Sequence, residues 1–354
     1  MNSIIATRST FLVTGACGFI GYHLCLRLLQ DGHSVVGVDN MNAYYDVQLK
    51  RNRLDQLQKD KGFSFQLLDI SDAKGLHEVF GHHSFDAVVH LAAQAGVRYS
   101  LDHPEVYIQS NVVGFANLVQ ECRMAHVPHL VYASSSSVYG ANEHSPFSVD
   151  DPVDHPISLY AATKRADELI AHAYSYLFSL PTTGLRFFTV YGPWGRPDMA
   201  LFLFTDAIFK GKPLTLFNGG EMYRDFTYVD DIIEAVTRLI PLAPEQSVQQ
   251  TLLESPSSST APFRVYNIGH GSPVRVGDCV DLIEECLGKK AIRVSAPIQP
   301  GDVVSTHADT ASLQRDTGFS PSIPIEVGIP RFVKWYMSYY EQQETWPCAA
   351  KREG

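Results

Sequence analysis

Short apolar runs alternate with segments of helical period over the first 190 residues, and this alternation most limits the possible folds. The apolar runs are Phe11–Gly15, Ser34–Val38, Phe63–Leu67, Ala87–Leu91 and His129–Ala133. We expect helices over 20–30, 45–58, 72–80, 104–126 and 158–179. Nearly continuous apolar strands that alternate with helices predict a parallel sheet covered on both faces. The expected fold class is therefore α/β, a doubly wound parallel sheet.

The pattern changes after residue 190, where prolines and glycines become frequent and the expected elements become shorter. We therefore expect a first domain over 1–190 and a smaller mixed α/β lobe over 191–345, with chain crossings back to the first domain. Segment 241–262 contains the near-featureless ESPSSSTAP and predicts a mobile surface loop. The last helix is expected over 324–341, and 346–354 is expected to be a frayed tail.

Charge and composition exclude several classes of partner. The chain has 28 Lys and Arg against 38 Asp and Glu, a formal net charge of −10, so a global basic surface for nucleic acid is absent. No apolar stretch is long enough to span a membrane or to form a signal peptide. The six cysteines are scattered and indicate reduced thiols in a cytoplasmic protein. The spacing of the histidines favours no metal site.

A glycine-rich turn between the first strand and the first helix predicts a phosphate site. The sequence from Gly15 to Gly21 reads G-x-x-G-x-x-G. A diphosphate needs backbone amides at a helix N-terminus, with no side chains in the way. The predicted contacts in this turn are Gly15, Gly18, Phe19, Ile20 and Gly21. A tight turn without a ligand would also favour glycine, so the turn alone is a weak signal.

An acid at the end of the second strand strengthens the prediction of a dinucleotide. Asp39 follows Gly21 by 18 residues, where a carboxylate can accept from both ribose hydroxyls of adenosine. No Arg or Lys follows until Lys50, so the sequence favours NAD over NADP. The other predicted cofactor contacts follow the second, third and fourth strands, and they are Asn40, Asn42, Asp69, Ile70, Leu91, Ala92, Ala93 and Gln94.

A tyrosine and a lysine at helical spacing predict a general base. Tyr160 and Lys164 form Y-x-x-x-K, and of the 17 tyrosines only Tyr160 has this spacing. On one helix face the ammonium lies near the phenol and stabilises the phenolate. Ser134–Ser137 end a strand before this helix and supply a hydroxyl donor, although a serine-rich turn is the structural alternative. Asn111 is a candidate for ordering the backbone near Ser135.

These motifs stand in an order that resembles extended short-chain dehydrogenases acting on nucleotide sugars. The order is the glycine-rich turn, Asp39, LAAQAGV, SSSSVYG, YAATK and RFFTVYGP, and the resemblance covers residues 8–341. It implies a Rossmann domain that holds NAD and a smaller lobe that holds the nucleotide of a sugar. Segments 38–46, 191–200, 220–231 and 299–303 resemble UDP-glucuronate 4-epimerases, which interconvert UDP-glucuronate and UDP-galacturonate.

The resemblance also implies roles for individual residues. Ser135 would donate to the sugar O4 with Ser136 and Ser137 beside it, Tyr160 would be the base, and Lys164 would be its partner. Thr189 and Arg196 would approach the carboxylate and the diphosphate, Arg224 would hold a phosphate, and Asp302 would cap the uridine ribose or the nearby backbone. Arg98 and Met199 complete the expected substrate contacts. The family resemblance further implies a homodimer formed by helices 104–126 and 158–179.

Related reactions start from the same C4 oxidation, and the sequence distinguishes among them. Dehydratases place an Asp-Glu pair where this chain has Ser136 and Ser137, and UDP-glucuronate decarboxylases place a Glu where Ser137 stands. Arg196 and the serines argue against a UDP-glucose 4-epimerase. A non-enzymatic NAD-binding scaffold would commonly lack Tyr160 or Lys164, and this chain keeps both. The expected reaction is C4 epimerisation through a 4-keto sugar with tightly bound NAD, and decarboxylase and UDP-glucose epimerase remain the alternatives.

Overall fold

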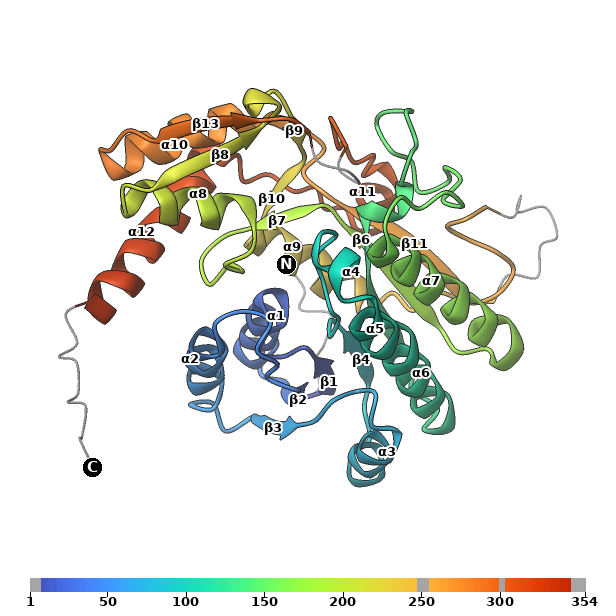
Figure 1. The fold of residues 1–354 in the computed structure, drawn as a ribbon. Coiled ribbons are helices and arrows are strands. Elements are labelled where there is room, and N and C mark those ends of the chain that lie inside the picture. The colour runs from blue at the N-terminus through green and yellow to red at the C-terminus, as the bar shows by residue number, and fades with distance from the viewer. Residues whose placement is uncertain (1–7, 247–254, 299–302, 345–354) are drawn as a thin grey trace.

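A seven-stranded parallel sheet forms the centre of the molecule in the computed structural model, which describes residues 8–246, 255–298 and 303–344 (Figure 1). The strand order is β11-β6-β5-β4-β1-β2-β3. The bounds are β1 Thr10–Thr14, β2 Ser34–Asp39, β3 Phe63–Leu67, β4 Ala87–His90, β5 Leu130–Ser135, β6 Thr182–Phe187 and β11 Phe263–Ile268. The order reverses between β1 and β4, which is where ligands bind in such sheets.

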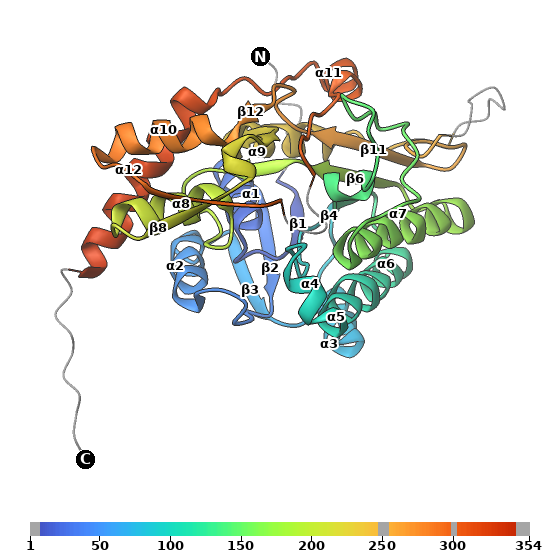
Figure 2. The same ribbon diagram turned by 45° about the horizontal axis from the view of Figure 1, so that its top comes forward.

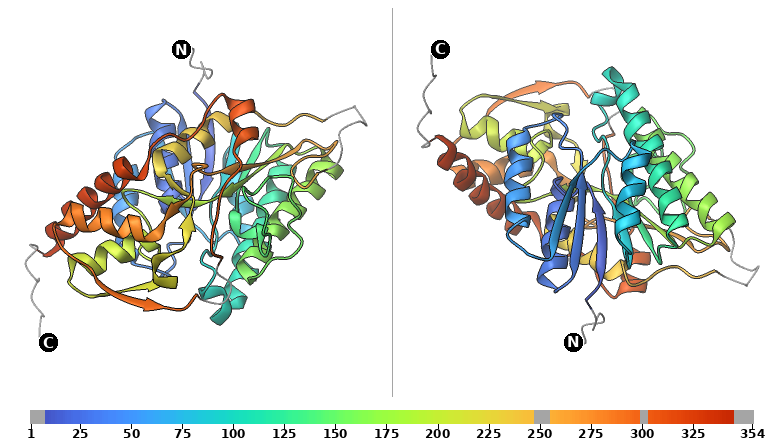
Figure 3. Two further views of the ribbon diagram at one scale, coloured as in Figure 1. Left: turned by 90° about the horizontal axis from the view of Figure 1, so that it is seen from above. Right: turned by 90° about the horizontal axis from the view of Figure 1, so that it is seen from below.

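Helices cover both faces of this sheet, as the sequence predicts. Residues that alternate along β1 enter different cores: Phe11 and Val13 belong to one buried cluster, whereas Leu12 belongs to another. The first core includes residues of α1 (Phe19–Gln30) and α9 (Val229–Leu239). The second includes residues of α3 (Ala73–His82), α6 (Gly114–Met124) and α7 (Leu159–Phe178), which are stacked along one side of the sheet (Figure 3). The fold class is therefore confirmed.

A second lobe lies beside the carboxyl ends of the first strands and has its own core (Figures 1 and 2). Leu201, Ile283 and Phe332 are among its buried residues. Its elements are α8 Ala200–Phe209, β8 Pro213–Phe217, β9 Tyr223–Arg224, β12 Val274–Arg275, α10 Val276–Leu287, β13 Ile292–Ala296 and α12 Ile325–Glu344. The parallel pair β7 (Thr189–Tyr191) and β10 (Phe226–Tyr228) joins the two lobes. The chain also returns to the first domain. Strand β11 adds to the seven-stranded sheet beside β6, and α11 (Ala311–Thr317) packs against β11.

The structure differs locally from the expectation of one helix over 104–126. The segment expected as one helix over 104–126 consists of α5 (Pro104–Tyr107), a π-helical turn η1 (Ile108–Val113) and α6, with α4 (Tyr99–Asp102) before them. The π turn carries Asn111, which is fully buried. In the ESPSSSTAP stretch, Ser257 donates to Asp150 and the Ser259 hydroxyl pairs with His172.

Other expectations fall partly outside the described residues. These are the segment 247–254, the tail 346–354 and the proposed ligand Asp302. The mobility of 241–262 and the division of the chain at residue 190 stay predictions. Within the described ranges, no helix combines the length and the apolar character that a membrane crossing requires.

Candidate active site

A cavity of about 380 Å³ lies at the carboxyl ends of the central strands, and both lobes contribute to its wall. It brings together all the residues predicted to contact NAD and the predicted catalytic group. These are Gly15, Gly18, Phe19, Ile20, Gly21, Asp39, Asn40, Asn42, Asp69, Ile70, Leu91, Ala92, Ala93, Gln94, Ser135, Ser136, Ser137, Tyr160 and Lys164. Residues as far apart in sequence as Gly15 and Lys164 therefore line one space, as the placement of ligands at the strand ends requires.

The glycine-rich turn leaves open backbone where a diphosphate would bind. Gly15 has φ +71°, and a Cβ at this position would lie 2.7 Å from the Ala92 nitrogen. A Cβ on Gly21 would lie 2.0 Å from the Gly15 oxygen, so α1 packs directly against the turn. Gly18 precedes α1 and supplies no side-chain cap for its first amides. These residues fit a dinucleotide, because a helix N-terminus with unblocked amides attracts phosphate.

Asp39 links this turn to β2. The Cys17 amide donates to Asp39 Oδ2 at 3.0 Å, and the Met41 amide donates to Oδ1 at 2.8 Å. Each carboxylate oxygen has a second lone pair, which a ribose hydroxyl can use. Nearby, Asn40 donates to Asp69 Oδ2 at 2.7 Å. Burial opposes ionisation of Asp69, but hydrogen bonds from Asn40 and Ser71 lower its pKa below the usual value.

Sequence reasoning missed several residues of the cavity wall. Tyr44, Tyr45 and Lys50 follow β2, and all three line the cavity, together with Gly96 beyond β4. The family resemblance carried the signal for Tyr44 and Tyr45 through the segment from 38 to 46 and for Gly96 through LAAQAGV, whereas Lys50 lies in neither segment. From the sequence, Lys50 was considered only as a cation too far from Asp39 to hold a 2′-phosphate. The structure corrects this view by placing Lys50 in the cavity wall.

Helix α7 contributes both Tyr160 and Lys164 to the cavity wall, at the end that we call the chemical end because it carries the predicted catalytic residues. Ser158 starts this helix, because its hydroxyl accepts the Ala161 amide at 3.1 Å. Lys164 Nζ donates to the Ala133 carbonyl at 2.9 Å and to Asp167 Oδ2 at 3.1 Å. Both contacts hold the ammonium between β5 and α7. Desolvation by burial raises the pKa of Asp167 to about 7, against the effect of Lys164.

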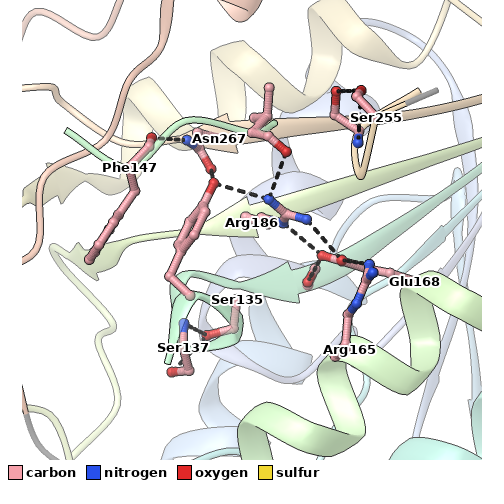
Figure 4. A network of polar contacts seen from close by, with 12 residues as sticks. Ser135, Ser137, Phe147, Arg165, Glu168, Arg186, Ser255 and Asn267 are labelled. Carbon is pink, nitrogen blue, oxygen red and sulfur yellow. Dashed lines mark hydrogen bonds and ion pairs between the residues drawn. The ribbon is translucent and has the colours of Figure 1, made fainter. Parts of the chain in front are cut away.

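The four serines at the carboxyl end of β5 are not equivalent. The Ser134 hydroxyl donates to Glu168 at 2.6 Å and is buried, so it is engaged inside the fold. The Ser135 oxygen accepts the Ser137 amide at 3.1 Å, and its hydroxyl donates to the Ser137 hydroxyl at 3.1 Å (Figure 4). Ser135 thereby starts the 3-10 turn η2 (Ser136–Tyr139). Ser135–Ser137 line the cavity and make no hydrogen bond to the buried Glu168.

A buried ion pair holds these parts together. Arg186 of β6 donates to both oxygens of Glu168, at 2.9 and 3.0 Å, and to the Tyr139 hydroxyl at 3.1 Å (Figure 4). Tyr139 in turn donates to Asn267 of β11 at 2.6 Å. Burial alone would raise the pKa of Glu168, but Arg186 lowers it below the usual value. The network fixes β5, β6, β11 and α7 beneath the serines.

A second polar contact orders the loop after β4. The Asn111 side chain accepts the Gln94 amide at 2.8 Å, and it donates to the Gln94 carbonyl and the Thr163 hydroxyl, both at 3.0 Å. This residue therefore ties the strand end to α7. The sequence predicted an ordering role near Ser135, and the structure places that role at Gln94.

The predicted substrate residues divide into two groups. Thr189, Arg196 and Met199 line the cavity. The Arg98 guanidinium lies over the Phe217 ring at 4.7 Å, and Arg224 donates to the Tyr223 and Val304 carbonyls, so neither side chain is part of the cavity wall as the structure describes it. Their roles toward a substrate, and that of Asp302, stay predictions.

Acidic side chains are confined to one end of the cavity. Among the described residues of its wall, the carboxylates are Asp39 and Asp69, and both lie at the ends of β2 and β3. The chemical end carries hydroxyls, a phenol and an ammonium instead. Such a site can hold and reprotonate a sugar oxygen, but its described residues offer no second acid for eliminating a hydroxyl group.

Comparisons with known proteins agree with this arrangement. Residues 11–269 match the model of the NAD dependent epimerase/dehydratase family. The probable UDP-glucuronate 4-epimerase of Rhizobium meliloti is 46% identical over 337 residues, which cover 95% of this chain and 99% of that protein. UDP-glucuronate 4-epimerase 1 of Arabidopsis thaliana is 48% identical, over 93% of this chain and 77% of that protein.

Solved structures show the same relationship. The crystal structure of UDP-glucuronic acid 4-epimerase from Bacillus cereus, in complex with UDP-glucuronic acid and NAD, superposes with a TM-score of 0.82. It is 31% identical and covers 94% of this chain and 100% of its own. With the family model matched over most of the chain, the protein belongs to the NAD dependent epimerase/dehydratase family.

Proposed function

We propose that this protein is a UDP-glucuronate 4-epimerase, which reversibly converts UDP-glucuronate to UDP-galacturonate with tightly bound NAD. One observation carries the proposal: a single cavity joins the Gly15–Gly21 turn to Tyr160, Lys164 and Ser135–Ser137, and the carboxylates among the described residues of its wall lie at its dinucleotide end. The printed names of the Rhizobium and Arabidopsis relatives and the ligands of the Bacillus structure support the same reaction.

The residues of this chain would carry the proton transfers. Bound NAD supplies an acceptor and donor of the C4 hydrogen. Tyr160 takes the proton of O4, Lys164 stabilises the phenolate, and Ser135 donates a hydrogen bond to O4. After the 4-keto sugar turns over in the site, so that the opposite face of C4 would receive the hydrogen, Tyr160 returns the proton to O4. The Asp167 and Ala133 contacts keep the Lys164 ammonium in place for both steps.

The substrate carboxylate needs separate control. A 4-keto uronic acid is a β-keto acid, and it loses CO₂ when its carboxylate turns perpendicular to the ketone. Ser137 and Thr189 line the cavity and are neutral hydroxyl donors, so they can hold the carboxylate without adding negative charge. Arg196 also lines the cavity, where Asp198 accepts from its Nε at 3.0 Å and fixes its orientation. We assign these residues and Met199 to the sugar, and Arg98, Arg224 and Asp302 to the UDP portion or its surroundings.

The reaction can be tested with the purified protein alone. Given UDP-glucuronate without added NAD, it should form UDP-galacturonate, because NAD stays bound through the catalytic cycle. NMR of the products is the appropriate measurement. Release of CO₂ with a UDP-pentose would show a decarboxylase instead, and turnover of UDP-glucose in preference to UDP-glucuronate would show the neutral-sugar epimerase.

We further propose a homodimer in the cytoplasm. On α7, Leu169, Tyr176 and Leu177 are 55%, 67% and 66% exposed, and Ile108 of η1 and Met124 of α6 are also exposed. Apolar side chains on neighbouring helices favour an interface between two copies. Sedimentation equilibrium should give the mass of two chains, and the mass of one chain would contradict the proposal. Buried free thiols at Cys17, Cys25, Cys122 and Cys279 support a reducing compartment.

A further inference from the structure

Three cations line the cavity, and they differ in how their charge is compensated. Lys164 lies 3.1 Å from Asp167, and Arg196 is paired with Asp198. Lys50 instead donates to two neutral oxygens of Asn42, the backbone carbonyl at 2.7 Å and the side-chain carbonyl at 2.8 Å. Within the described ranges of the chain, Lys50 has no ion pair with a carboxylate. It is therefore the cation of this wall that has charge available for a ligand.

Lys50 is also buried, at 5% exposure, with its ammonium 4.6 Å from the centre of the Tyr45 ring. Desolvation lowers its pKa below the usual value, and Asp39 only partly opposes this effect. A buried ammonium without a counter-charge is costly, so such groups are usually paired or bind an anion. Asp39 offsets the charge of Lys50 only in part and forms no ion pair with it among the described residues, so an anionic ligand would complete the compensation.

A second buried cation stands behind Lys50. Arg53 is fully buried on the same helix, α2 (Val47–Leu57), and its partners are neutral: the Cys17 carbonyl at 2.8 Å, the Tyr45 hydroxyl at 2.8 Å and the Trp194 carbonyl at 2.6 Å. Asp39 is the carboxylate that raises the pKa of Lys50, so two cations, Lys50 and Arg53, share one acid here. Because Arg53 and Asp39 both contact the backbone of Cys17, this positive excess lies at the glycine-rich turn.

We infer that Lys50 is the cation that neutralises a nucleotide diphosphate bound against the Gly15–Gly21 turn. Asn42 holds two of the three ammonium donors and leaves one for a phosphate oxygen. The backbone amides of the turn supply donors but no full charge, and Lys50 adds that charge. This inference rests on the NAD-binding part of the proposed function, and it assigns Lys50 to the dinucleotide rather than to UDP.

The test compares Lys50→Met with wild-type protein and with Lys74→Met, whose lysine is 88% exposed. The three proteins are purified in parallel, and the nucleotide released by acid is quantified. We expect Lys50→Met to bind NAD at least about tenfold more weakly, because a buried cation no longer faces the diphosphate. Lys50→Arg should retain more NAD than Lys50→Met. Lys74→Met should match wild type, and UDP affinity should be unchanged in all variants.

The thermal stability of the nucleotide-free protein distinguishes a ligand-binding role of Lys50 from a structural one. After nucleotide is removed from both proteins, Lys50→Met should melt no earlier than wild type, because the substitution removes a desolvated charge. If the wild-type protein holds NAD and Lys50→Met holds the same amount, the inference is overturned and the proposed function stays intact. Weaker UDP binding with unchanged NAD binding would also overturn it. Wild-type protein without any affinity for NAD would overturn the proposed function itself.

Discussion

Replacement of Tyr160 by phenylalanine is expected to lower kcat by about 10³-fold while bound NAD remains. The substitution removes one hydroxyl and keeps the ring, whose centre lies 6.1 Å from that of Tyr107. Lys164 then keeps its contacts with Ala133 and Asp167, so the cavity should stay assembled. Without the phenol, the O4 proton has no base beside it. The rate of UDP-galacturonate formation and the NAD content per chain are the two quantities to measure.

Tyr176→Phe is the matched control for this experiment. Tyr176 lies on the same helix, is 67% exposed and does not line the cavity. This control should keep wild-type kcat. Full activity in Tyr160→Phe would remove Tyr160 from the mechanism, whereas loss of both activity and NAD would mean that the cavity had collapsed.

Replacement of Glu168 by alanine is expected to lower the free energy of unfolding by about 3–5 kcal/mol, because it leaves a buried charge without its partner. Glu168 and Arg186 are both fully buried, and they make two hydrogen bonds with each other. Glu168 also accepts from Ser134 at 2.6 Å and from Arg165 at 3.0 Å. Denaturant unfolding monitored by circular dichroism gives the change, and Glu78→Ala, on an exposed helix surface, is the control that should change little.

A double variant and a pH series test the cause of this loss. Glu168→Leu combined with Arg186→Met should be more stable than Glu168→Ala alone, because no unpaired charge remains. The pKa of Glu168 is lower in the folded protein than its usual value, so its stabilising contribution is present above that value. It is lost as pH falls through the folded pKa, and Glu168→Gln should flatten this acid limb. An unchanged acid limb in Glu168→Gln would contradict the assignment.

The sequence predicted those parts of the fold that depend on local pattern. The apolar runs at β1 and β2 gave strand positions to within a residue or two, because these strands are buried in a parallel sheet. The run at β3 also matches its strand, although β3 lies at the edge of the sheet and its residues are half-buried or exposed. The Gly15–Gly21 turn, Asp39 and Tyr160 with Lys164 also carry local spacing rules, and the structure brings them into one cavity. The serine cluster was placed correctly at the carboxyl end of β5 for the same reason.

Features that depend on distant partners could not be read from the sequence. The π turn around Asn111 has no pattern of its own, and it becomes visible only through the contacts with Gln94 and Thr163. The pairing of Glu168 with Arg186 joins a helix to a neighbouring strand, so no helical or strand period reports it. The sequence also did not show which way a charged side chain points. Lys50 points into the cavity wall, whereas Arg98 lies over Phe217.

The central claim is that the C4 hydrogen leaves the sugar and returns to the same carbon within one closed site. UDP-glucuronate that carries deuterium at C4 tests it most directly, with the product analysed by NMR and mass spectrometry in ordinary water. The account predicts UDP-galacturonate that keeps its deuterium at C4. Product with hydrogen from the solvent at C4 would contradict it, because the inversion would then have proceeded by deprotonation of that carbon.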